Sequence, residues 1–174
     1  MKIALVGVDG AGKTTIIKKI TENNNNIKII YMGFRDFKFQ NLIDRLGKSK
    51  ITLFFQHFIV FVENLFRYRK ALNYEKDGYD IVFDRYPLID YQVASKGSYL
   101  IYTLFYKYFF PKPDKIILIV GDVDEIYKRK PELTKSEIKN LQAKLKELKL
   151  YDNVIFNKTG YLDKTLELLK KEFK

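Results

Sequence analysis

A phosphate-binding pattern lies close to the start of the chain. Gly7 and Gly12 flank four residues, and Lys13 and Thr14 follow directly. Glycines at this spacing let the backbone curl so that several amide N–H groups point at one anion. Lys13 would supply a mobile positive charge to the β- and γ-phosphates, and the Thr14 hydroxyl would bind Mg²⁺. The pattern therefore predicts a P-loop that binds a nucleoside triphosphate.

The segments on both sides of this loop favour the same interpretation. Residues 2–6 are expected to form a buried strand, and residues 14–22 carry isoleucines at helical spacing. A P-loop requires a strand, a loop and a helix in this order, and a simple glycine-rich turn would rarely have both flanks. The predicted nucleotide-binding residues are Gly7, Asp9, Gly10, Ala11, Gly12, Lys13, Thr14 and Thr15, together with Asn157 after the last predicted strand.

Charged residues also follow two other predicted strands. Arg35 comes after strand 27–32, and Asp-Arg-Tyr-Pro at 84–87 comes after strand 79–83. Ligands of open α/β sheets lie beyond the carboxyl ends of the strands, and a proline stops further β pairing. An acid and a base that leave the sheet together suggest a metal or phosphate contact. Position alone leaves Arg35 open to either role, a solvated surface residue or the contact for a second anion.

The order of the expected elements indicates the fold class. The predicted strands are 2–6, 27–32, 79–83, 115–120 and 154–156. The predicted helices are 14–22, 52–76, 91–110, which Gly97 interrupts, and 162–173. Strands that alternate with helices argue for a parallel sheet covered on both faces. We therefore expect one domain over 1–174, a three-layer α/β/α fold of the P-loop type with a five-stranded parallel sheet. The charged segment 124–149, which contains a capping-box pattern at 134–137, is expected to form a helical lid.

Composition narrows the possible partners. Lys and Arg outnumber Asp and Glu by 32 to 21, and a net charge of +11 attracts polyanions. Small phosphorylated ligands account for this charge, so nucleic acid is an unlikely partner. The chain has no Cys, which excludes disulfides and a thiolate nucleophile. Its longest apolar tracts are too short to cross a bilayer, and no signal peptide precedes the first strand, so we expect a cytoplasmic protein.

Three features together resemble the thymidylate kinase family of nucleoside monophosphate kinases: Gly-x-Asp-Gly-Ala-Gly-Lys-Thr-Thr at the start, Asp-Arg-Tyr at a mid-chain strand end, and a basic lid. The segment 128–133 looks more like the thymidylate kinase-like branch. The resemblance implies that Asp9 approaches the acceptor sugar, that Arg35 and Arg85 bind the acceptor phosphate, and that Asp84 lies near the metal. Thr14 and Asp84 are thus the predicted metal ligands.

The resemblance also implies residues around the acceptor base. Tyr91-Gln92 resembles a pair that follows the family's Asp-Arg-Tyr sequence, with shorter spacing here and without the usual Ser. The long helix offers several Phe and both Arg67 and Arg69, with no unambiguous match to the family's Phe and Arg. The substrate-binding residues proposed on this basis are Asp9, Arg35, Phe61, Arg67, Arg85, Tyr86 and Gln92.

Phosphoryl transfer to a phosphate needs positioning and cations, because the acceptor is already an anion. No general base is required, and the single histidine, His57, lies among apolar residues and is expected to be structural. No arginine lies between Gly7 and Gly12, so a lid cation should stabilise the transition state. Arg129 is preferred over Lys128 and Lys130 because its planar fork can bridge two phosphate oxygens. The predicted catalytic residues are Lys13, Asp84, Arg85 and Arg129.

The predicted function is ATP- and Mg²⁺-dependent phosphoryl transfer to a nucleoside monophosphate, with dTMP the first acceptor to consider. One alternative is a deoxynucleoside kinase in which Asp84 acts as general base. Another is a nucleic-acid-associated P-loop ATPase, suggested by the net charge. A homodimer is expected, since the aromatic segments 91–110 and 52–76 hold more apolar surface than one core needs.

Overall fold

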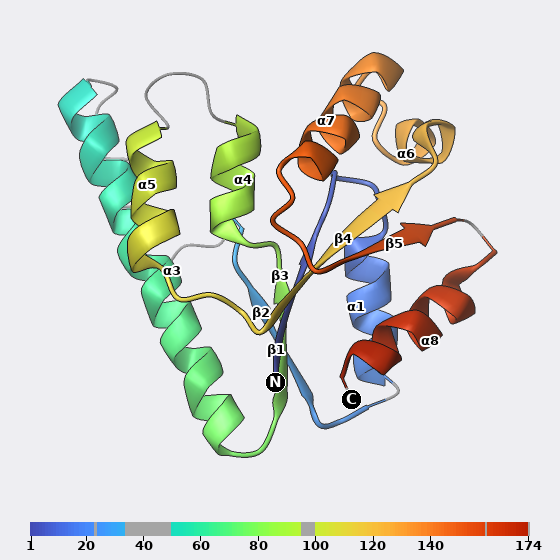
Figure 1. The fold of residues 1–174 in the computed structure, drawn as a ribbon, viewed down its shortest axis with the longest axis horizontal. Coiled ribbons are helices and arrows are strands. Elements are labelled where there is room, and N and C mark those ends of the chain that lie inside the picture. The colour runs from blue at the N-terminus through green and yellow to red at the C-terminus, as the bar shows by residue number, and fades with distance from the viewer. Residues whose placement is uncertain (23, 34–49, 95–99, 159, 174) are drawn as a thin grey trace.

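The chain folds around a five-stranded parallel sheet with helices on both faces (Figure 1). The computed structural model describes residues 1–174 apart from 23, 34–49, 95–99, 159 and 174. The strands are β1 (Lys2–Val6), β2 (Ile27–Tyr31), β3 (Asp80–Asp84), β4 (Lys115–Gly121) and β5 (Asn153–Asn157). The helices are α1 (Lys13–Glu22), α3 (Lys50–Lys76), α4 (Pro87–Ala94), α5 (Leu100–Phe109), α6 (Val123–Arg129), α7 (Lys135–Glu147) and α8 (Leu162–Glu172).

The strand order places the functional loops beside one another. The order is β2-β3-β1-β4-β5, and every neighbouring pair is parallel. Leu5 of β1 pairs with Asp84 of β3, and Tyr31 of β2 pairs with the same residue from the other side. All carboxyl ends therefore meet at one edge of the sheet, where a parallel α/β sheet binds its ligands. The predicted α/β/α architecture is confirmed.

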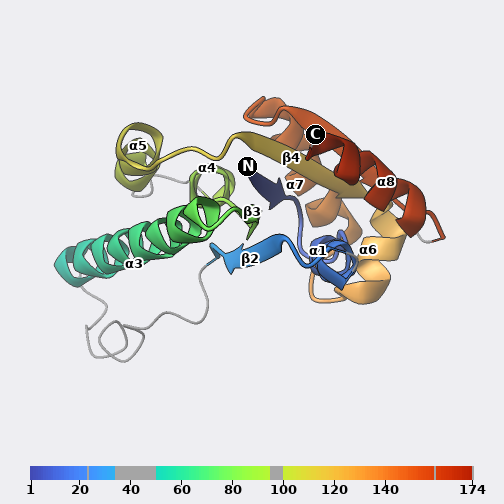
Figure 2. The ribbon, with the colours of Figure 1, turned by 90° about the horizontal axis from the view of Figure 1, so that it is seen from below.

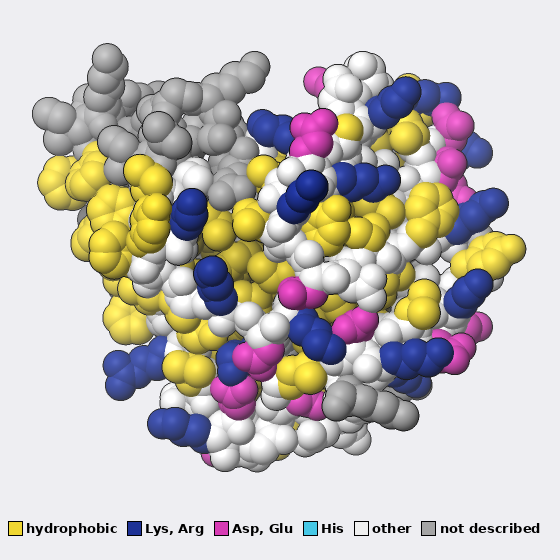
Figure 3. Space-filling view, in the orientation of Figure 1, with side chains coloured by type: hydrophobic (Ala, Val, Ile, Leu, Met, Phe, Trp, Pro, Cys, Tyr) yellow, Lys and Arg dark blue, Asp and Glu magenta, His cyan; other side chains and the backbone are white. Residues whose placement is uncertain are grey.

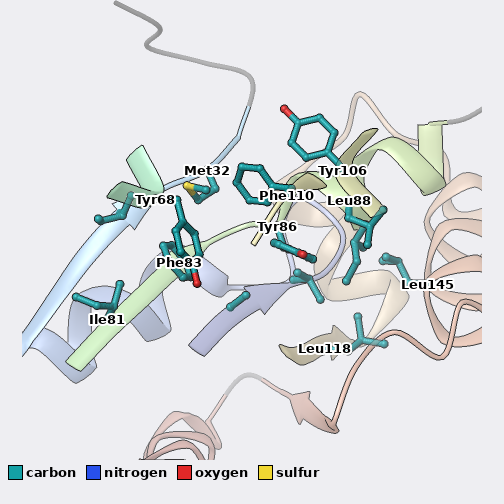
Figure 4. Packing of buried hydrophobic residues seen from close by; sticks show 14 of the residues in the cluster. Met32, Tyr68, Ile81, Phe83, Tyr86, Leu88, Tyr106, Phe110, Leu118 and Leu145 are labelled. Atoms are coloured by element: carbon teal, nitrogen blue, oxygen red, sulfur yellow. The ribbon is translucent and has the colours of Figure 1, made fainter. Parts of the chain in front are cut away.

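Two hydrophobic cores hold the layers together. On one face, α3, α4, α5 and α7 cover side chains such as Phe83 and Leu118, and Figure 4 shows the labelled residues of this cluster. On the other face, α1 and α8 cover Ile3 and Ile117, which are fully buried. Successive strand residues point to opposite faces, so alternate residues of one strand enter different cores. Figure 2 shows the sheet from below, with α3 and α5 on one side and α8 on the other.

The segment 91–110, predicted to be helical with an interruption at Gly97, contains two helices, and the first of them begins earlier than predicted. The structure has α4 and α5 packed side by side, and α4 begins at Pro87. Proline is well suited to the first helical turn, because its missing N–H would have no partner there and its φ is already helical. Pro87 therefore starts a helix shortly after β3 ends at Asp84. The interval between the two helices, which includes Gly97, lies outside the described residues.

The charged segment 124–149 forms α6 and α7, and α7 is anchored in the cores. Ile138 and Leu145 are buried, and the Gln142 amide donates to the Gly121 carbonyl and accepts from its N–H, both at 3.0 Å. α6 buries Ile126. Lid motion of 124–149 stays a prediction.

The predicted capping box at the start of α7 is present, and it allows a direct stability test. The Thr134 hydroxyl accepts from the Glu137 N–H at 3.2 Å, and the Glu137 carboxylate accepts from the Thr134 N–H at 2.7 Å. We expect Thr134→Ala to lower the free energy of unfolding by about 1 kcal/mol, because it leaves a helix N–H without its cap. Urea denaturation measures this change. Ser136→Ala, at an exposed position in the same turn, is the control and should change little.

Candidate active site

A cavity of about 690 Å³ opens where the strands end. It is bounded by the loop after β1, the ends of β2 and β3, the end of α6 and the segment after β5. The lining residues that the sequence predicts are Asp9, Gly10, Gly12, Lys13, Thr14, Thr15, Asp84, Arg85, Arg129 and Asn157. The fold thus brings together residues from four separate parts of the chain.

The loop after β1 is held tightly against its neighbours. Gly7 has φ +150°, and a Cβ there would lie 2.2 Å from the carbonyl oxygen of Ile119 in β4. Gly12 has φ +93°, and a Cβ would lie 2.3 Å from Nδ2 of Asn157. Only glycine fits such positions without moving the backbone. Ala11 is buried, and its carbonyl accepts from Asn157 Nδ2 at 2.8 Å, so Asn157 braces the loop.

Lys13 lies folded into its own loop. Its Nζ donates to the carbonyls of Gly7 at 2.7 Å and Val8 at 2.9 Å, and the residue is only 5% exposed. Burial lowers the pKa of the Lys13 ammonium, with a further lowering by the nearby charge of Arg85. The loop therefore holds a desolvated cation, which a phosphate would stabilise more strongly than two carbonyls do.

Asp9 and Arg85 form an ion pair across the cavity. One Arg85 Nη donates to Asp9 Oδ1, which also lies 3.9 Å from Lys13 Nζ. Arg85 has φ +79°, a left-handed conformation that costs a non-glycine residue roughly 1–2 kcal/mol. This backbone conformation occurs where β3 turns into α4, and the side chain reaches the loop after β1. Strain of this kind is often found at functional positions.

Thr14 and Asp84 provide oxygen ligands of the kind that Mg²⁺ prefers. Both line the cavity, and Thr14 is exposed. Burial raises the pKa of the Asp84 carboxyl, and the positive charges of Lys13 and Arg85 oppose this rise. Among the described residues, no three His, Cys, Asp or Glu side chains gather into a metal site. Mg²⁺ is usually bound by one or two protein oxygens together with phosphate oxygens of the ligand. Thr14 and Asp84 fit this kind of site.

Arg129 reaches the loop from α6. Its Nη1 donates to the Gly10 carbonyl at 3.1 Å, and its Nη2 lies 3.4 Å from Glu125 Oε2. The Asp122 side chain caps α6 by accepting from two backbone N–H groups, which fixes the start of this helix. Lys130 also lines the cavity, whereas Lys128 does not. Of the three lid cations, the structure therefore places two at the loop.

Asp90 is a charged residue near the site that the sequence analysis missed. It lies in the first turn of α4, with Oδ1 3.9 Å from Arg85 Nη1. Its Oδ2 is buried and has no hydrogen-bond partner among the described residues. Burial raises the pKa of Asp90 to about 6, although Arg85 and Lys13 pull it down. Asp90 follows the Asp-Arg pair at the end of β3 by about one helical turn. This spacing is the sequence signal that could have indicated it.

The raised pKa of Asp90 makes stability depend on pH. A folded-state pKa of about 6, against an ordinary 3.8, means that the folded state disfavours the charged form. The cost grows as pH rises from about 4 to 6 and reaches roughly 3 kcal/mol near pH 7. We expect Asp90→Asn to raise the free energy of unfolding by that amount near pH 7, with the gain vanishing near pH 4.

Urea denaturation at both pH values measures this effect, and Asp77→Asn, an exposed position, is the control. If Asp90→Asn raised the free energy of unfolding equally at both pH values, Asp90 would not become protonated in the folded state between them.

Several predicted substrate residues lie away from the cavity. Tyr86 is 2% exposed in the core, and the Phe61 ring packs against Tyr106 at 5.1 Å between ring centres. Arg67 donates to the carbonyls of Tyr31 at 3.0 Å and Gly33 at 3.3 Å, at the end of β2. Arg35 lies outside the described residues, as does the side chain of Gln92 in α4. For these residues the predicted substrate contacts stay predictions.

His57 does not line this cavity. It lies on α3, beside the aromatic side chains of Phe54, Phe61 and Tyr106. Burial lowers the pKa of its imidazole, which favours the neutral form. This placement agrees with a structural role for the histidine.

Three comparisons relate the chain to known proteins. A family model for thymidylate kinase matches residues 5–163. A comparison with curated proteins finds no match. Among solved structures, thymidylate kinase from Candida albicans superposes with a TM-score of 0.70 at 20% identity, over 99% of this chain and 90% of that one.

Two further structures are similar. A deoxyadenosine kinase from M. mycoides, with products dCMP and dCDP bound, gives a TM-score of 0.61 at 21% identity over 99% of this chain and 98% of that one. Thymidylate kinase from Ehrlichia chaffeensis gives 0.61 at 17% identity, over 100% and 98%. At these identities the three structures show the shared fold alone.

Proposed function

Since the chain belongs to the thymidylate kinase family of nucleoside monophosphate kinases, we propose that it transfers the terminal phosphoryl group of ATP to dTMP and forms dTDP and ADP. The observation that carries this proposal is the cavity that unites Lys13 and Thr14 with Asp84, Arg85 and Arg129. Those side chains supply the cations and the oxygen ligands that phosphoryl transfer requires.

The donor binds at the loop after β1. Backbone N–H groups and Lys13 hold the β- and γ-phosphates, and Lys13 exchanges its contacts with Gly7 and Val8 for phosphate oxygens. Thr14 and Asp84 would hold Mg²⁺, which neutralises charge on the phosphates when it is bound. Arg129 lies at the Gly10 carbonyl, close enough to the loop to reach the group in transfer. The side chains thus neutralise and align the phosphates, and no protein base is needed.

The acceptor binds on the β2–β3 side of the cavity. Arg85 grips the acceptor phosphate together with Arg35, and releases Asp9 when it does so. Asp9 then accepts a hydrogen bond from the acceptor sugar hydroxyl. The Asp9 side chain is 43% exposed in the structure, and a bound acceptor would cover it. A carboxylate that is covered without this partner is costly, so an acceptor that lacks the 3′-hydroxyl should be poor. The preference for thymine rests on family membership.

An acceptor panel tests the proposal. The protein is incubated with Mg-ATP and dTMP, UMP, CMP, AMP, thymidine or deoxyadenosine, and both ADP and the phosphorylated product are measured. Transfer to dTMP above the other acceptors supports the proposal. Transfer to a nucleoside and not to dTMP would instead favour a deoxynucleoside kinase, in which Asp84 accepts the hydroxyl proton.

We expect Arg85→Ala to raise the KM for the acceptor by about 10- to 100-fold with little change in the KM for ATP, because one guanidinium can hold a phosphate through two hydrogen bonds. Steady-state kinetics with each substrate varied in turn measure the asymmetry. Arg69→Ala, an exposed arginine on α3, is the matched control. A rise in the ATP KM alone would place Arg85 at the donor.

A nucleic-acid-associated ATPase is the other alternative, because of the net charge of +11. It predicts phosphate release that polynucleotide stimulates and that needs no acceptor. The acceptor panel tests this alternative if single-stranded DNA replaces the acceptor and phosphate release is measured. Phosphate release without a phosphorylated product would overturn the kinase proposal.

The proposed enzyme is a homodimer in the cytoplasm, where its nucleotide substrates are found. α3 and α5 together expose large hydrophobic side chains, and Figure 3 shows hydrophobic residues gathered over these helices at the left. The exposed residues are Phe54, Phe55, Phe58, Phe66, Leu72, Leu104, Tyr108 and Phe109. A second copy would remove this apolar surface from water. Among the described residues, no helix is long and apolar enough to span a membrane.

A further inference from the structure

Tyr31 lies in the candidate active site, although no motif of the sequence indicates it. It is the last residue of β2, it is half-buried, and it lines the cavity at the strand ends. In the ladder between β2 and β3 it pairs with Asp84, and the residue after Asp84 is Arg85. Figure 2 shows β2 beside β3. Tyr31 therefore belongs to the wall of the cavity where the acceptor is proposed to bind.

Gly33 leaves room for the Tyr31 side chain. A Cβ at Gly33 would lie 2.3 Å from the Tyr31 hydroxyl oxygen and 2.6 Å from Cδ of Arg85. The φ of Gly33 lies outside the left-handed region, so space and not backbone conformation requires glycine here. Because both atoms lie so close to one point, the Tyr31 hydroxyl and the Arg85 side chain are neighbours.

Arg67 of α3 holds the end of β2 in place. Its Nη1 donates to the carbonyls of Tyr31 at 3.0 Å and Gly33 at 3.3 Å, and its guanidinium carbon lies 5.8 Å from the centre of the Tyr31 ring. A guanidinium over an aromatic ring at this distance is attracted to it. Arg67 Nε in turn lies 3.3 Å from Oε1 of Glu63, which is 3% exposed. The Tyr31 side chain is therefore held before any ligand binds, so it loses little conformational freedom on binding.

The electrostatics of Arg85 agree with this placement. Burial lowers the pKa of the Arg85 guanidinium, but three neighbours outweigh burial and raise the pKa: Asp90, Asp9 and the Tyr31 phenol. An effect of Tyr31 on that pKa means that its phenol lies close to the guanidinium. A protonated tyrosine hydroxyl carries no charge and can donate a hydrogen bond to an anion. Arg85 and Tyr31 thus present a cation and a neutral donor on the same wall of the cavity.

From these contacts we propose that Tyr31 is a further binding residue for the acceptor, whose hydroxyl donates a hydrogen bond to an oxygen of the acceptor phosphate beside Arg85. The assignment rests on the proposed function, because it takes Arg85 as the residue that holds this phosphate. Arg85 supplies the charge, and the Tyr31 hydroxyl fixes the direction in which the phosphate points. Gly33 and Arg67 are positioning residues that act through Tyr31.

Tyr31→Phe tests the assignment, because it removes the hydroxyl and keeps the ring over Gly33. Calorimetry measures the binding of dTMP and of thymidine to the full chain with saturating Mg-ADP, which occupies the donor site. We expect the variant to bind dTMP about 10-fold more weakly and thymidine equally well, because only dTMP carries the phosphate that the hydroxyl contacts. The same comparison of dAMP with deoxyadenosine should give the same factor, since the contact does not involve the base.

Tyr79→Phe is the matched control. Tyr79 is also half-buried and also lies beside a cation, with Lys28 Nζ 4.3 Å from its ring centre, but it precedes β3 at the end of the sheet away from the cavity. It should leave the binding of both ligands unchanged. If Tyr31→Phe leaves dTMP binding unchanged, or weakens dTMP and thymidine equally, the hydroxyl does not contact the phosphate and the assignment fails.

Failure of the proposed function gives a different result. A nucleoside kinase would bind thymidine as its acceptor and dTMP as its product, and a loss confined to dTMP would still support the contact with Tyr31. If the unaltered protein bound no monophosphate at all, both the proposed function and the assignment would be overturned.

Gly33→Ala tests how the hydroxyl is positioned. The added Cβ would displace both the Tyr31 hydroxyl and Arg85, so dTMP binding should weaken more than in Tyr31→Phe. In the Gly33→Ala background, Tyr31→Phe should then have little further effect, because the hydroxyl has already lost its position. Urea denaturation of the same preparations shows whether either variant is less stable. Normal dTMP binding by Gly33→Ala would overturn the role given to Gly33.

Discussion

Replacing Lys13 by Met should lower kcat by at least about 1,000-fold, because the transferring phosphoryl group loses a cation placed in a largely desolvated loop. The same change should leave the protein no less stable. Burial lowers the pKa of Lys13, which means that the folded state disfavours its charged form at neutral pH. A neutral side chain of similar length removes that cost, so activity and stability should respond in opposite directions.

Coupled-assay turnover and urea denaturation measure the two effects on the same preparation. Lys18→Met is the matched control, because Lys18 lies on the exposed side of the same helix. It should change neither quantity beyond experimental error. Near-normal turnover in Lys13→Met would remove the lysine from the reaction, and a large loss of stability would mean that its bonds to Gly7 and Val8 outweigh its desolvation.

Arg129→Ala should lower kcat by about 1,000-fold while the affinity for ATP changes little, because the guanidinium is expected to act on charge that develops during transfer. Contacts with Gly10 and Glu125 hold it beside the loop before any reaction. Arg129→Lys should restore only a small part of the kcat that Arg129→Ala loses. The reason is that an ammonium lacks the planar, forked geometry with which a guanidinium bridges two phosphate oxygens. Turnover kinetics and equilibrium ATP binding separate the two quantities.

Lys128→Ala and Lys130→Ala accompany this test. Lys128 does not line the cavity and should be neutral, whereas Lys130 lines it but pairs with Glu132 at 3.2 Å. A normal kcat in Arg129→Ala with a large loss in Lys130→Ala would transfer the role to the lysine. A parallel loss of ATP affinity would show that Arg129 binds the ground state and not the transition state.

Much of the fold could be predicted because the relevant signals are local. The runs at 2–6 and 115–120, which are apolar after an initial lysine, form β1 and β4, and the capping-box pattern marks the start of α7. The glycine spacing identified the loop after β1, and strand-end positions placed Asp84 and Arg85 at the same edge of the sheet. These inferences needed only periodicity, turn chemistry and the rule on strand ends.

The remainder depends on contacts that are far apart in the sequence. Asn157 lines the cavity, where its contact with nucleotide stays a prediction, and its amide also braces Ala11, which only the packing of β5 beside the loop reveals. Tyr86 directly follows Asp84 and Arg85, but its side chain points into the core. That direction depends on how α4 begins. Asp90 differs from the other acids through its burial, which no local pattern reports. Side-chain direction and desolvation depend on tertiary packing, so they could not be predicted from local patterns in a single sequence.

The position of β1 in the sheet has a consequence for how the protein is made. β1 is synthesised first, yet its partners are Ile81 and its neighbours in β3 and Lys115 and its neighbours in β4. One side of β1 therefore has no native partner until β3 has left the ribosome, and the other side has none until β4 has followed, and closing such long loops is slow. During that time an apolar strand is exposed to other chains and open to aggregation. The loop that would bind ATP can form only after β4 has emerged, so nucleotide should promote the last stage of folding and not the first.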